Sequence, residues 1–121
     1  MKRILIVDDE RSSRQLLDVM LRSDGFLIEM AEGGEEALAM IAAQPPDLVL
    51  LDVMMPRMDG YQVAAAIRAN PATSHLPVVM ISGTDDDRPP APGGHGPASD
   101  FLTKPVDRVE LCRLVGALLA D

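Results

Sequence analysis

The sequence predicts an α/β protein built on a doubly wound parallel sheet. Short apolar runs of strand length alternate with segments in which apolar residues recur every three to four positions, the period of an amphipathic helix. Three of the runs, at residues 4–7, 48–51 and 78–81, contain no polar residue, which is typical of strands buried on both faces. Strands that alternate with helices favour parallel pairing through right-handed crossovers.

The first strand, at residues 4–7, leads into a helix. Ser12 or Ser13 could cap this helix, and Gly25 ends it, because glycine commonly follows the last helical turn. The apolar positions of this helix are Leu16, Leu17, Met20 and Leu21.

The middle of the chain repeats the strand–helix unit twice. A short strand at residues 26–31 and a glycine turn at 33–34 precede a second helix, which the prolines at 45–46 stop. A third strand at 48–52 and a third helix at 61–70 follow. A fourth strand at residues 78–82, a fifth strand in the stretch 100–105 and a last helix complete the prediction, and Asp107 can cap that helix. The apolar side of the last helix consists of Val109, Leu111, Cys112, Leu114, Val115, Leu118 and Leu119.

The alternation breaks after Ser82, where a fourth helix should follow. Four prolines and three glycines lie within residues 89–97. Inside a helix each proline costs ~3 kcal/mol and each glycine ~1 kcal/mol. We expect residues 85–99 to be an irregular Pro/Gly-rich segment in place of that helix. Residues 78–81 would then be partly exposed on one face, and such an apolar patch marks a partner or dimer contact.

Three hypotheses describe residues 85–99. In the first hypothesis the segment is a flexible loop, and a second copy or a partner covers the patch. We favour it because a stretch so rich in proline and glycine is commonly disordered. Alternatively, it packs irregularly over the patch with its prolines extended. In the third hypothesis the domain folds but relays poorly.

Length and composition indicate one domain spanning residues 1–121, with 47% hydrophobic residues for its core. The net charge of −8 argues against direct nucleic-acid binding and against an anionic membrane surface. No apolar run reaches the ~20 residues of a membrane span. The single cysteine, Cys112, forbids an internal disulfide and is expected to be a structural residue in a reducing compartment. We therefore expect a cytoplasmic protein.

Polar side chains follow the predicted strands where each one ends. Asp8 and Asp9 follow the first strand, Asp52 and Ser82 end the third and fourth, and Lys104 follows the fifth. Ligands of open α/β sheets bind outside the carboxyl ends of the strands, so these groups are expected to meet there. Three crowded carboxylates suit Mg²⁺, which prefers oxygen ligands and shares its shell with phosphate.

This set of groups has the chemistry of a phosphoryl-transfer site. An aspartate can attack phosphorus, while a lysine, a hydroxyl and a metal stabilise the phosphoryl oxygens. Each feature alone has a simpler reading: an Asp-Asp pair can cap a helix or be solvated in a loop, and Lys104 can be a surface lysine before a turn. Chance does not readily explain why all of these polar groups occur in this order, each at the end of an apolar strand.

Four segments carry a family resemblance. They are Ile-Leu-Ile-Val-Asp-Asp-Glu at 4–10, Asp-Leu-Val-Leu-Leu-Asp-Val-Met-Met-Pro-Arg-Met-Asp-Gly at 47–60, Pro-Val-Val-Met-Ile-Ser-Gly at 77–83 and Asp-Phe-Leu-Thr-Lys-Pro at 100–105. Together they resemble the response-regulator receiver domain of two-component signalling, the family of the bacterial chemotaxis regulator. The resemblance implies a flavodoxin-like five-stranded sheet in the order 2-1-3-4-5.

The resemblance also implies roles for the site residues. Asp52 would be the phosphoacceptor and form an acyl phosphate. Asp9 and Asp52 would bind Mg²⁺ through their carboxylates, Met54 through its backbone carbonyl and Asp8 through a water. Lys104 would pair first with Asp52 and then with the phosphoryl group.

A switch is implied as well. Ser82 occupies the position of the switch hydroxyl and Phe101 that of the switch aromatic, and the Lys104-Pro105 bond would be cis. In the family the hydroxyl moves toward the phosphoryl oxygen while the ring turns inward. Phe101 has no phenol, so a signal carried by a tyrosine hydroxyl would be missing.

The expected function is that of a signalling module, not a metabolic enzyme. A histidine kinase or phosphotransfer protein would supply the phosphoryl group, the domain would catalyse its own phosphorylation and dephosphorylation, and a downstream protein or output domain would read the change. A homodimer through the face left open at residues 78–81 is a further expectation. The alternatives are a binding or dimerisation module with impaired switching, and a Mg²⁺-dependent aspartyl-phosphate phosphatase, against which Met54 counts because such enzymes place an acid there.

Overall fold

The computed structural model describes residues 1–83 and 98–120. Its strands are β1 (Arg3–Val7), β2 (Leu27–Ala31), β3 (Leu48–Asp52), β4 (Val78–Ser82) and β5 (Asp100–Thr103). Its helices are α1 (Arg11–Arg22), α2 (Gly34–Ala43), α3 (Gly60–Ala69) and α4 (Arg108–Leu119). Every expected strand and helix in the described ranges is therefore present.

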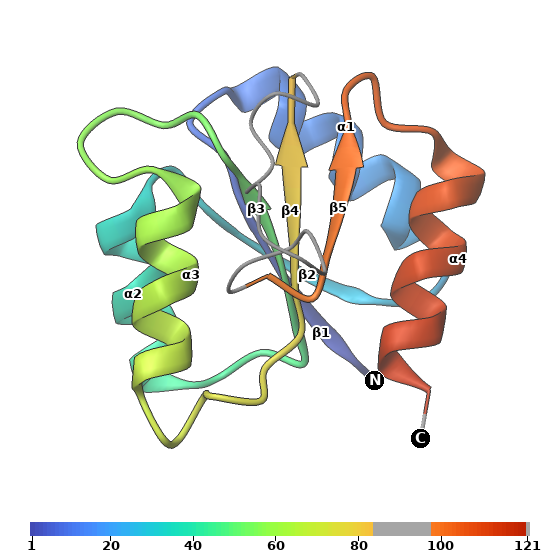
Figure 1. Cartoon of the computed structure of the whole chain (residues 1–121). Coiled ribbons are helices and arrows are strands. Elements are labelled where there is room, and N and C mark those ends of the chain that lie inside the picture. Colours follow the sequence, from blue (N-terminus) through green and yellow to red (C-terminus); the bar gives the residue numbers. More distant parts are fainter. Residues whose placement is uncertain (84–97, 121) are drawn as a thin grey trace.

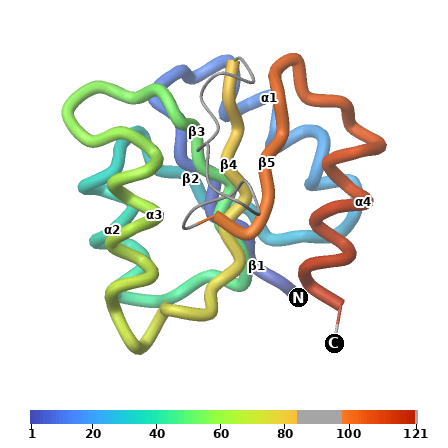
Figure 2. The backbone as a smooth tube through the Cα atoms, in the orientation of Figure 1, coloured from blue at the N-terminus to red at the C-terminus, as the bar shows by residue number. Residues whose placement is uncertain are grey.

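The five strands form one parallel sheet in the order β2-β1-β3-β4-β5 (Figure 1). This order confirms the expected 2-1-3-4-5 arrangement. The register pairs Val7 with Leu51 and Asp52 with Ile81, so the carboxyl ends of β1, β3 and β4 lie at the same edge of the sheet. The backbone trace in Figure 2 shows α3 connecting β3 to β4 on one side of the sheet, and α4 following β5 on the other.

Alternating side chains divide the core between the two faces of the sheet. One cluster contains Leu5, Val49, Leu51 and Met80 and packs against α2 and α3. The other contains Ile4, Ile6, Leu48 and Leu50 and packs against α1 and α4. Figure 1 shows these two helix pairs on opposite sides of the sheet. The alternation therefore decides which face each residue at a strand end approaches.

The expectation that residues 78–81 are partly exposed is wrong. Val78, Val79 and Met80 are completely buried and Ile81 is 2% exposed. β4 lies between β3 and β5, and both of its faces belong to core clusters. On the α3 face, the residues that share a cluster with β4 include Ala64, Ile67, Leu76, Ala98 and Phe101. The residues of β4 therefore form no exposed apolar patch.

The expectation of an irregular segment at residues 85–99 falls largely outside the described residues, because residues 84–97 are not among them. Ala98 and Ser99 form a bend that leads into β5. The Ser99 backbone N–H donates to the Val78 carbonyl at 2.7 Å, which fixes the start of β5 beside β4.

The helix ends follow local sequence signals only in part. Asp107 caps α4 as expected, because its carboxylate accepts from the Glu110 backbone N–H at 2.9 Å. Ser12 and Ser13 lie inside α1, whose N-cap residue is Glu10 and has no side-chain cap. Asp59 caps α3 in a reciprocal capping box with Gln62, which the sequence analysis overlooked.

Two residues assigned to apolar helix faces are exposed. Leu16 of α1 is 54% exposed and Val109 of α4 is 71% exposed. The buried stripe of α1 is Arg14, Leu17 and Leu21, so Leu16 lies beside it. Among the described residues no helix could span a membrane; the longest have 12 residues.

Candidate functional site

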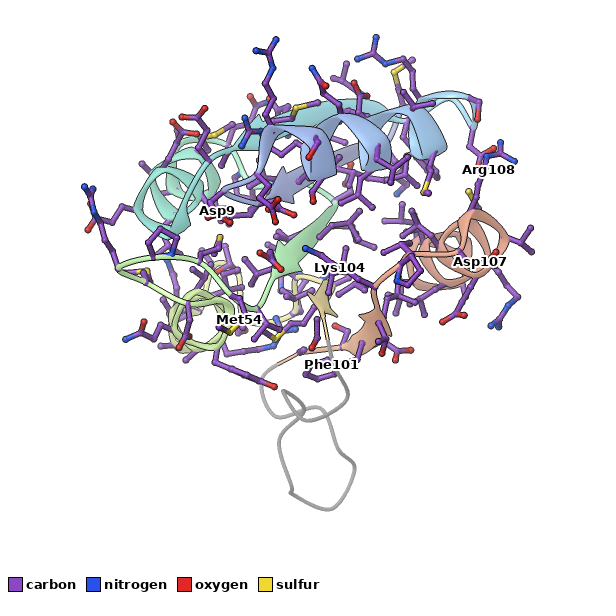
Figure 3. All side chains as sticks on the ribbon, turned by 90° about the horizontal axis from the view of Figure 1, so that it is seen from above. Asp9, Met54, Phe101, Lys104, Asp107 and Arg108 are labelled. Atoms are coloured by element: carbon purple, nitrogen blue, oxygen red, sulfur yellow. The ribbon has the colours of Figure 1, made fainter. Side chains whose placement is uncertain are left out.

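The alternation of the strands brings three charged groups to one side of the sheet. Asp8, Asp52 and Lys104 continue the series of residues that pack under α1 and α4, at intervals of two. They emerge where β1, β3 and β5 end. Figure 3 looks down on these strand ends, with Lys104 and Asp9 near the central strands and Asp107 and Arg108 apart from them at the start of α4.

Three carboxylates converge at this edge, as expected. One oxygen from each of Asp8, Asp9 and Asp52 lies within 4.8 Å of the others. Asp8 is 1% exposed and Asp52 is 5% exposed, whereas Asp9 is open to solvent. Two buried carboxylates and a third at the rim form an all-oxygen donor set, which fits a hard cation such as Mg²⁺.

Lys104 lies between the two buried carboxylates. Its Nζ is 3.4 Å from Asp52 Oδ1 and 3.7 Å from Asp8 Oδ2. Burial lowers the pKa of Lys104, but attraction to Asp52 and Asp8 outweighs burial, and the net change is upward. The lysine is therefore held in its charged form, as a counter-ion for the acidic groups.

The surroundings of Asp52 raise the proton affinity of its carboxylate. Burial and the neighbouring Asp8 raise the pKa of Asp52 from 3.8 to about 6, although Lys104 acts in the opposite direction. Lys104 therefore does not offset the combined effect of burial and of the neighbouring carboxylates on Asp52. A cation bound by the carboxylates would supply the missing positive charge.

The loop after β1 holds Asp8 in place. Asp8 Oδ1 accepts from the Glu10 backbone N–H at 2.9 Å, and the Asp8 N–H donates to the Ala31 carbonyl at 3.2 Å. The guanidinium of Arg14 donates to the Asp8 carbonyl at 2.8 Å. Arg14 is 8% exposed, and its role beside Asp8 was not predicted from the sequence. Its spacing from Leu17 and Leu21 could have placed it on the inner face of α1.

Gly60 permits α3 to begin directly against β3. A Cβ at this position would lie 2.5 Å from the Asp52 carbonyl oxygen and 2.9 Å from Val53 Cα. The Gly60 N–H donates to the Val53 carbonyl at 2.9 Å. This close approach explains the need for glycine beside Asp52.

The remaining predicted residues surround this centre. Ser82 is completely buried at the end of β4, and its backbone carbonyl accepts from the Lys104 N–H at 2.7 Å. Met54 lies in the loop after β3 with 67% of its surface exposed. The Lys104-Pro105 bond is cis, as expected.

Phe101 lies deeper in the sheet than the acidic cluster. It pairs in register with Met80, two residues before the pair formed by Ser82 and Thr103. Its ring is 3% exposed, and its centroid is 6.2 Å from that of Tyr61. Ser82 and Phe101 occupy the same face of neighbouring strands, on the side of α3.

Two hollows lie near the strand ends. The smaller, of about 100 Å³, is lined by residues that include Lys104, Pro105 and Leu16. It is well below the ~300 Å³ at which small-molecule pockets begin. The larger, of about 430 Å³, lies between Gly34 and Met58 and contains none of the predicted site residues. Neither hollow is a substrate pocket centred on Asp52.

Known proteins that resemble this chain in sequence are response regulators or match the same family. The family model described as the response regulator receiver domain matches residues 4–116. The response regulator PleD of Caulobacter vibrioides is 44% identical over 116 residues, which make up 96% of this chain and 26% of PleD. Protein PilH of Pseudomonas aeruginosa is 36% identical over 120 residues, which cover 99% of each chain. This chain thus spans about a quarter of the first relative and nearly all of the second.

Solved structures agree. The response regulator TrrA of Thermotoga maritima, in complex with Mg²⁺ and BeF, superposes with a TM-score of 0.89 at 35% identity, covering 98% of this chain and 100% of TrrA. The chemotaxis protein CheY4 of Vibrio cholerae gives a TM-score of 0.83 at 28% identity, covering 98% and 99%.

Receiver domains bind Mg²⁺ at an acidic cluster and interact with histidine kinases or phosphotransfer proteins and with output domains, and this chain has such a cluster. The family model covers nearly the whole sequence, and the fold and the acidic cluster agree with it. The chain belongs to the response regulator receiver domain family, and it is a receiver domain of two-component signalling.

Proposed function

We propose that this receiver accepts a phosphoryl group on Asp52 from the phosphohistidine of a histidine kinase or a phosphotransfer protein. The observation that carries the proposal is the surroundings of Asp52: a buried carboxylate with Asp8 and Asp9 within 4.8 Å and the Lys104 ammonium at 3.4 Å. No other described carboxylates form such a group with each other.

The reaction would be an in-line displacement at phosphorus. An oxygen of the Asp52 carboxylate attacks the phosphorus atom, and the phosphorus–nitrogen bond of the donor breaks. Its electron pair stays on the imidazole nitrogen, which takes up a proton, and an acyl phosphate remains on Asp52. Lys104 would leave the carboxylate and neutralise a phosphoryl oxygen, and the Ser82 hydroxyl would donate to another. Attack of water on the phosphorus of the acyl phosphate would break its bond to the aspartyl oxygen, release inorganic phosphate and return Asp52 to its carboxylate.

Asp9 and Asp52 would hold Mg²⁺ through their carboxylates, Met54 through its backbone carbonyl and Asp8 through a water. When bound, the metal supplies positive charge for the transferring phosphoryl group and the acids around it. Burial of Asp8 and Asp52 limits competition from bulk water, while exposure of Asp9 leaves a route of entry.

Ser82 and Phe101 would carry the signal away from the site. Both lie on the α3 side of neighbouring strands, so movement of the Ser82 hydroxyl toward a phosphoryl oxygen changes the space beside the Phe101 ring. A downstream protein or an output domain would read this change in the cytoplasm. PleD is longer than this chain and PilH has the same length, so both kinds of partner suit the family.

A homodimer stays a proposal with less support. The reason for expecting one was an open apolar face over β4, and the described residues of β4 are buried. The net charge of −8 still favours the absence of direct nucleic-acid binding by this domain.

Intact mass measurement tests the proposed function. The domain is incubated with Mg²⁺ and acetyl phosphate, beside an Asp52→Asn control and a sample with chelator. We expect one added phosphoryl group that requires both Asp52 and Mg²⁺. If none forms, binding of beryllium fluoride, which mimics the phosphoryl group without being hydrolysed, separates fast hydrolysis from a site that does not take the group. Failure of both would contradict the proposal.

A further inference from the structure

Arg14 is a buried cation that is not itself a candidate metal ligand or nucleophile. It lies in the first turn of α1 and is 8% exposed. Its Nη1 donates to the Asp8 backbone carbonyl at 2.8 Å, and its Nη2 lies 3.4 Å from Glu32 Oε1. The side chain of Glu32 is 75% exposed, so this second contact is at the rim. Arg14 therefore links the loop after β1 to the loop after β2.

The contact with Asp8 acts on Asp9 through the backbone. The Asp8 carbonyl and the Asp9 N–H belong to one planar peptide group, so a donor that fixes the carbonyl also fixes the direction in which Asp9 leaves β1. Asp9 is the exposed member of the acidic cluster, whereas Asp8 and Asp52 are buried. The Asp9 carboxylate thus depends on its backbone for its position.

We propose that Arg14 is a positioning residue of the metal site, which orients the peptide between Asp8 and Asp9 and so aims the Asp9 carboxylate at the cation. This inference rests on the Mg²⁺ site of the proposed function. Residues that orient metal ligands without touching the metal commonly change its affinity by about 10–100-fold. Arginine suits this task because its rigid planar guanidinium presents one donor to the Asp8 carbonyl and another to Glu32, whereas lysine offers a point charge on a flexible stem.

The charge of Arg14 and its contact with Asp8 predict opposite changes in Mg²⁺ affinity when the side chain is removed. A cation beside an acidic cluster repels Mg²⁺, so by charge alone its removal would strengthen metal binding. If Arg14 aims Asp9, its removal weakens metal binding instead. A purely structural role would lower the free energy of unfolding of the metal-free domain and leave the Mg²⁺ affinity of the folded domain unchanged.

The test measures Mg²⁺ binding by calorimetric titration of the wild type, Arg14→Met and Arg14→Lys, with circular dichroism to establish folding. Arg14→Met keeps most of the aliphatic stem and removes the donors, and we expect the Kd for Mg²⁺ to rise by about tenfold. Arg14→Lys keeps the charge and loses the fork, and we expect a Kd between the other two. In metal-free protein, the backbone amide signal of Asp9 in a ¹⁵N correlation spectrum should shift in both variants.

An unchanged or lower Kd in folded Arg14→Met would overturn the inference. If Arg14→Met does not fold, Arg14→Lys decides: a Kd equal to that of the wild type, or an unmoved Asp9 amide signal, would overturn it. The wild-type titration separates this inference from the proposed function. Absence of Mg²⁺ binding by the wild type removes the metal site itself, whereas binding that both variants retain at full strength removes only the role of Arg14.

Discussion

Lys104 Nζ lies 3.4 Å from Asp52 Oδ1 and 3.7 Å from Asp8 Oδ2, so a single ammonium serves two buried carboxylates. With Asp9 at the rim, the site holds three acids for one base. Burial, and after it repulsion from Asp8, raises the pKa of Asp52 despite the nearby ammonium. The site is therefore less stable without a cation than with one, and it is suited to exchanging charged ligands.

Asp52→Asn should stabilise the metal-free domain near pH 7.5. The folded-state pKa of Asp52 is raised from 3.8 to about 6, so the folded state holds this proton more tightly than the unfolded chain does. Wild-type stability is therefore reduced as the pH rises through that interval. Removing the charge should add about 1–2 kcal/mol to the free energy of unfolding at pH 7.5 and nothing below about pH 4. Urea unfolding across this pH range measures the difference, with exposed Glu35→Gln as the control. A variant less stable than the wild type at pH 7.5 would contradict it.

Lys104→Met should have the opposite effect. It leaves Asp8 and Asp52 without their shared counter-ion, so we expect a loss of about 1–3 kcal/mol at pH 7.5 in the absence of metal. The loss should shrink as the pH falls below about 6, because Asp52 then takes up a proton. Lys2→Met, at an exposed position before β1, is the matched control. Equal stability of Lys104→Met and the wild type would show that the ammonium does not compensate the acids.

Gly60→Ala and Gly116→Ala should change stability in opposite directions. A Cβ at Gly60 would meet the Asp52 carbonyl oxygen at 2.5 Å, whereas a Cβ at Gly116 in α4 meets nothing within 4 Å. We expect Gly60→Ala to cost about 1–3 kcal/mol and Gly116→Ala to add about 0.5–1 kcal/mol. Thermal and urea unfolding of both variants measure this. Tolerance of alanine at Gly60 would mean that α3 can move away from Asp52.

Mg²⁺ should raise the thermal stability of the domain through Asp9. A ligand at a hundred times its Kd adds about 2.7 kcal/mol to the folded state. Because Asp9 is exposed, Asp9→Asn should leave the metal-free fold intact and abolish this gain. Scanning calorimetry with and without Mg²⁺ distinguishes the two proteins. A gain of the same size in both would place the metal elsewhere.

The strands could be predicted because a short, unbroken apolar run is typical of a strand buried on both faces of a sheet. β3 and β4 are buried at every position, as their sequences indicated. The strand order came from the family resemblance, because apolar runs alone do not specify their neighbours. The predicted exposure at 78–81 is wrong, because these residues are buried and belong to core clusters on both faces of the sheet.

The acidic cluster could be predicted for a related reason. Parallel strands deliver their carboxyl ends to one edge, so Asp8, Asp52 and Lys104 could be placed together from sequence position. Arg14 and Gly60 could not be found in this way. Arginine is usually a surface residue, and the approach of Gly60 to the Asp52 carbonyl is a contact between backbones that no residue pattern reports.

The most direct test of the account locates the phosphoryl group. After incubation with Mg²⁺ and acetyl phosphate, reduction with borohydride converts an aspartyl phosphate to homoserine, and peptide mass analysis identifies the residue. We predict homoserine at position 52 alone, and none when Mg²⁺ is removed. Homoserine at Asp8 or Asp9, or modification that is independent of Mg²⁺, would contradict the assignment of Asp52 as the phosphoacceptor.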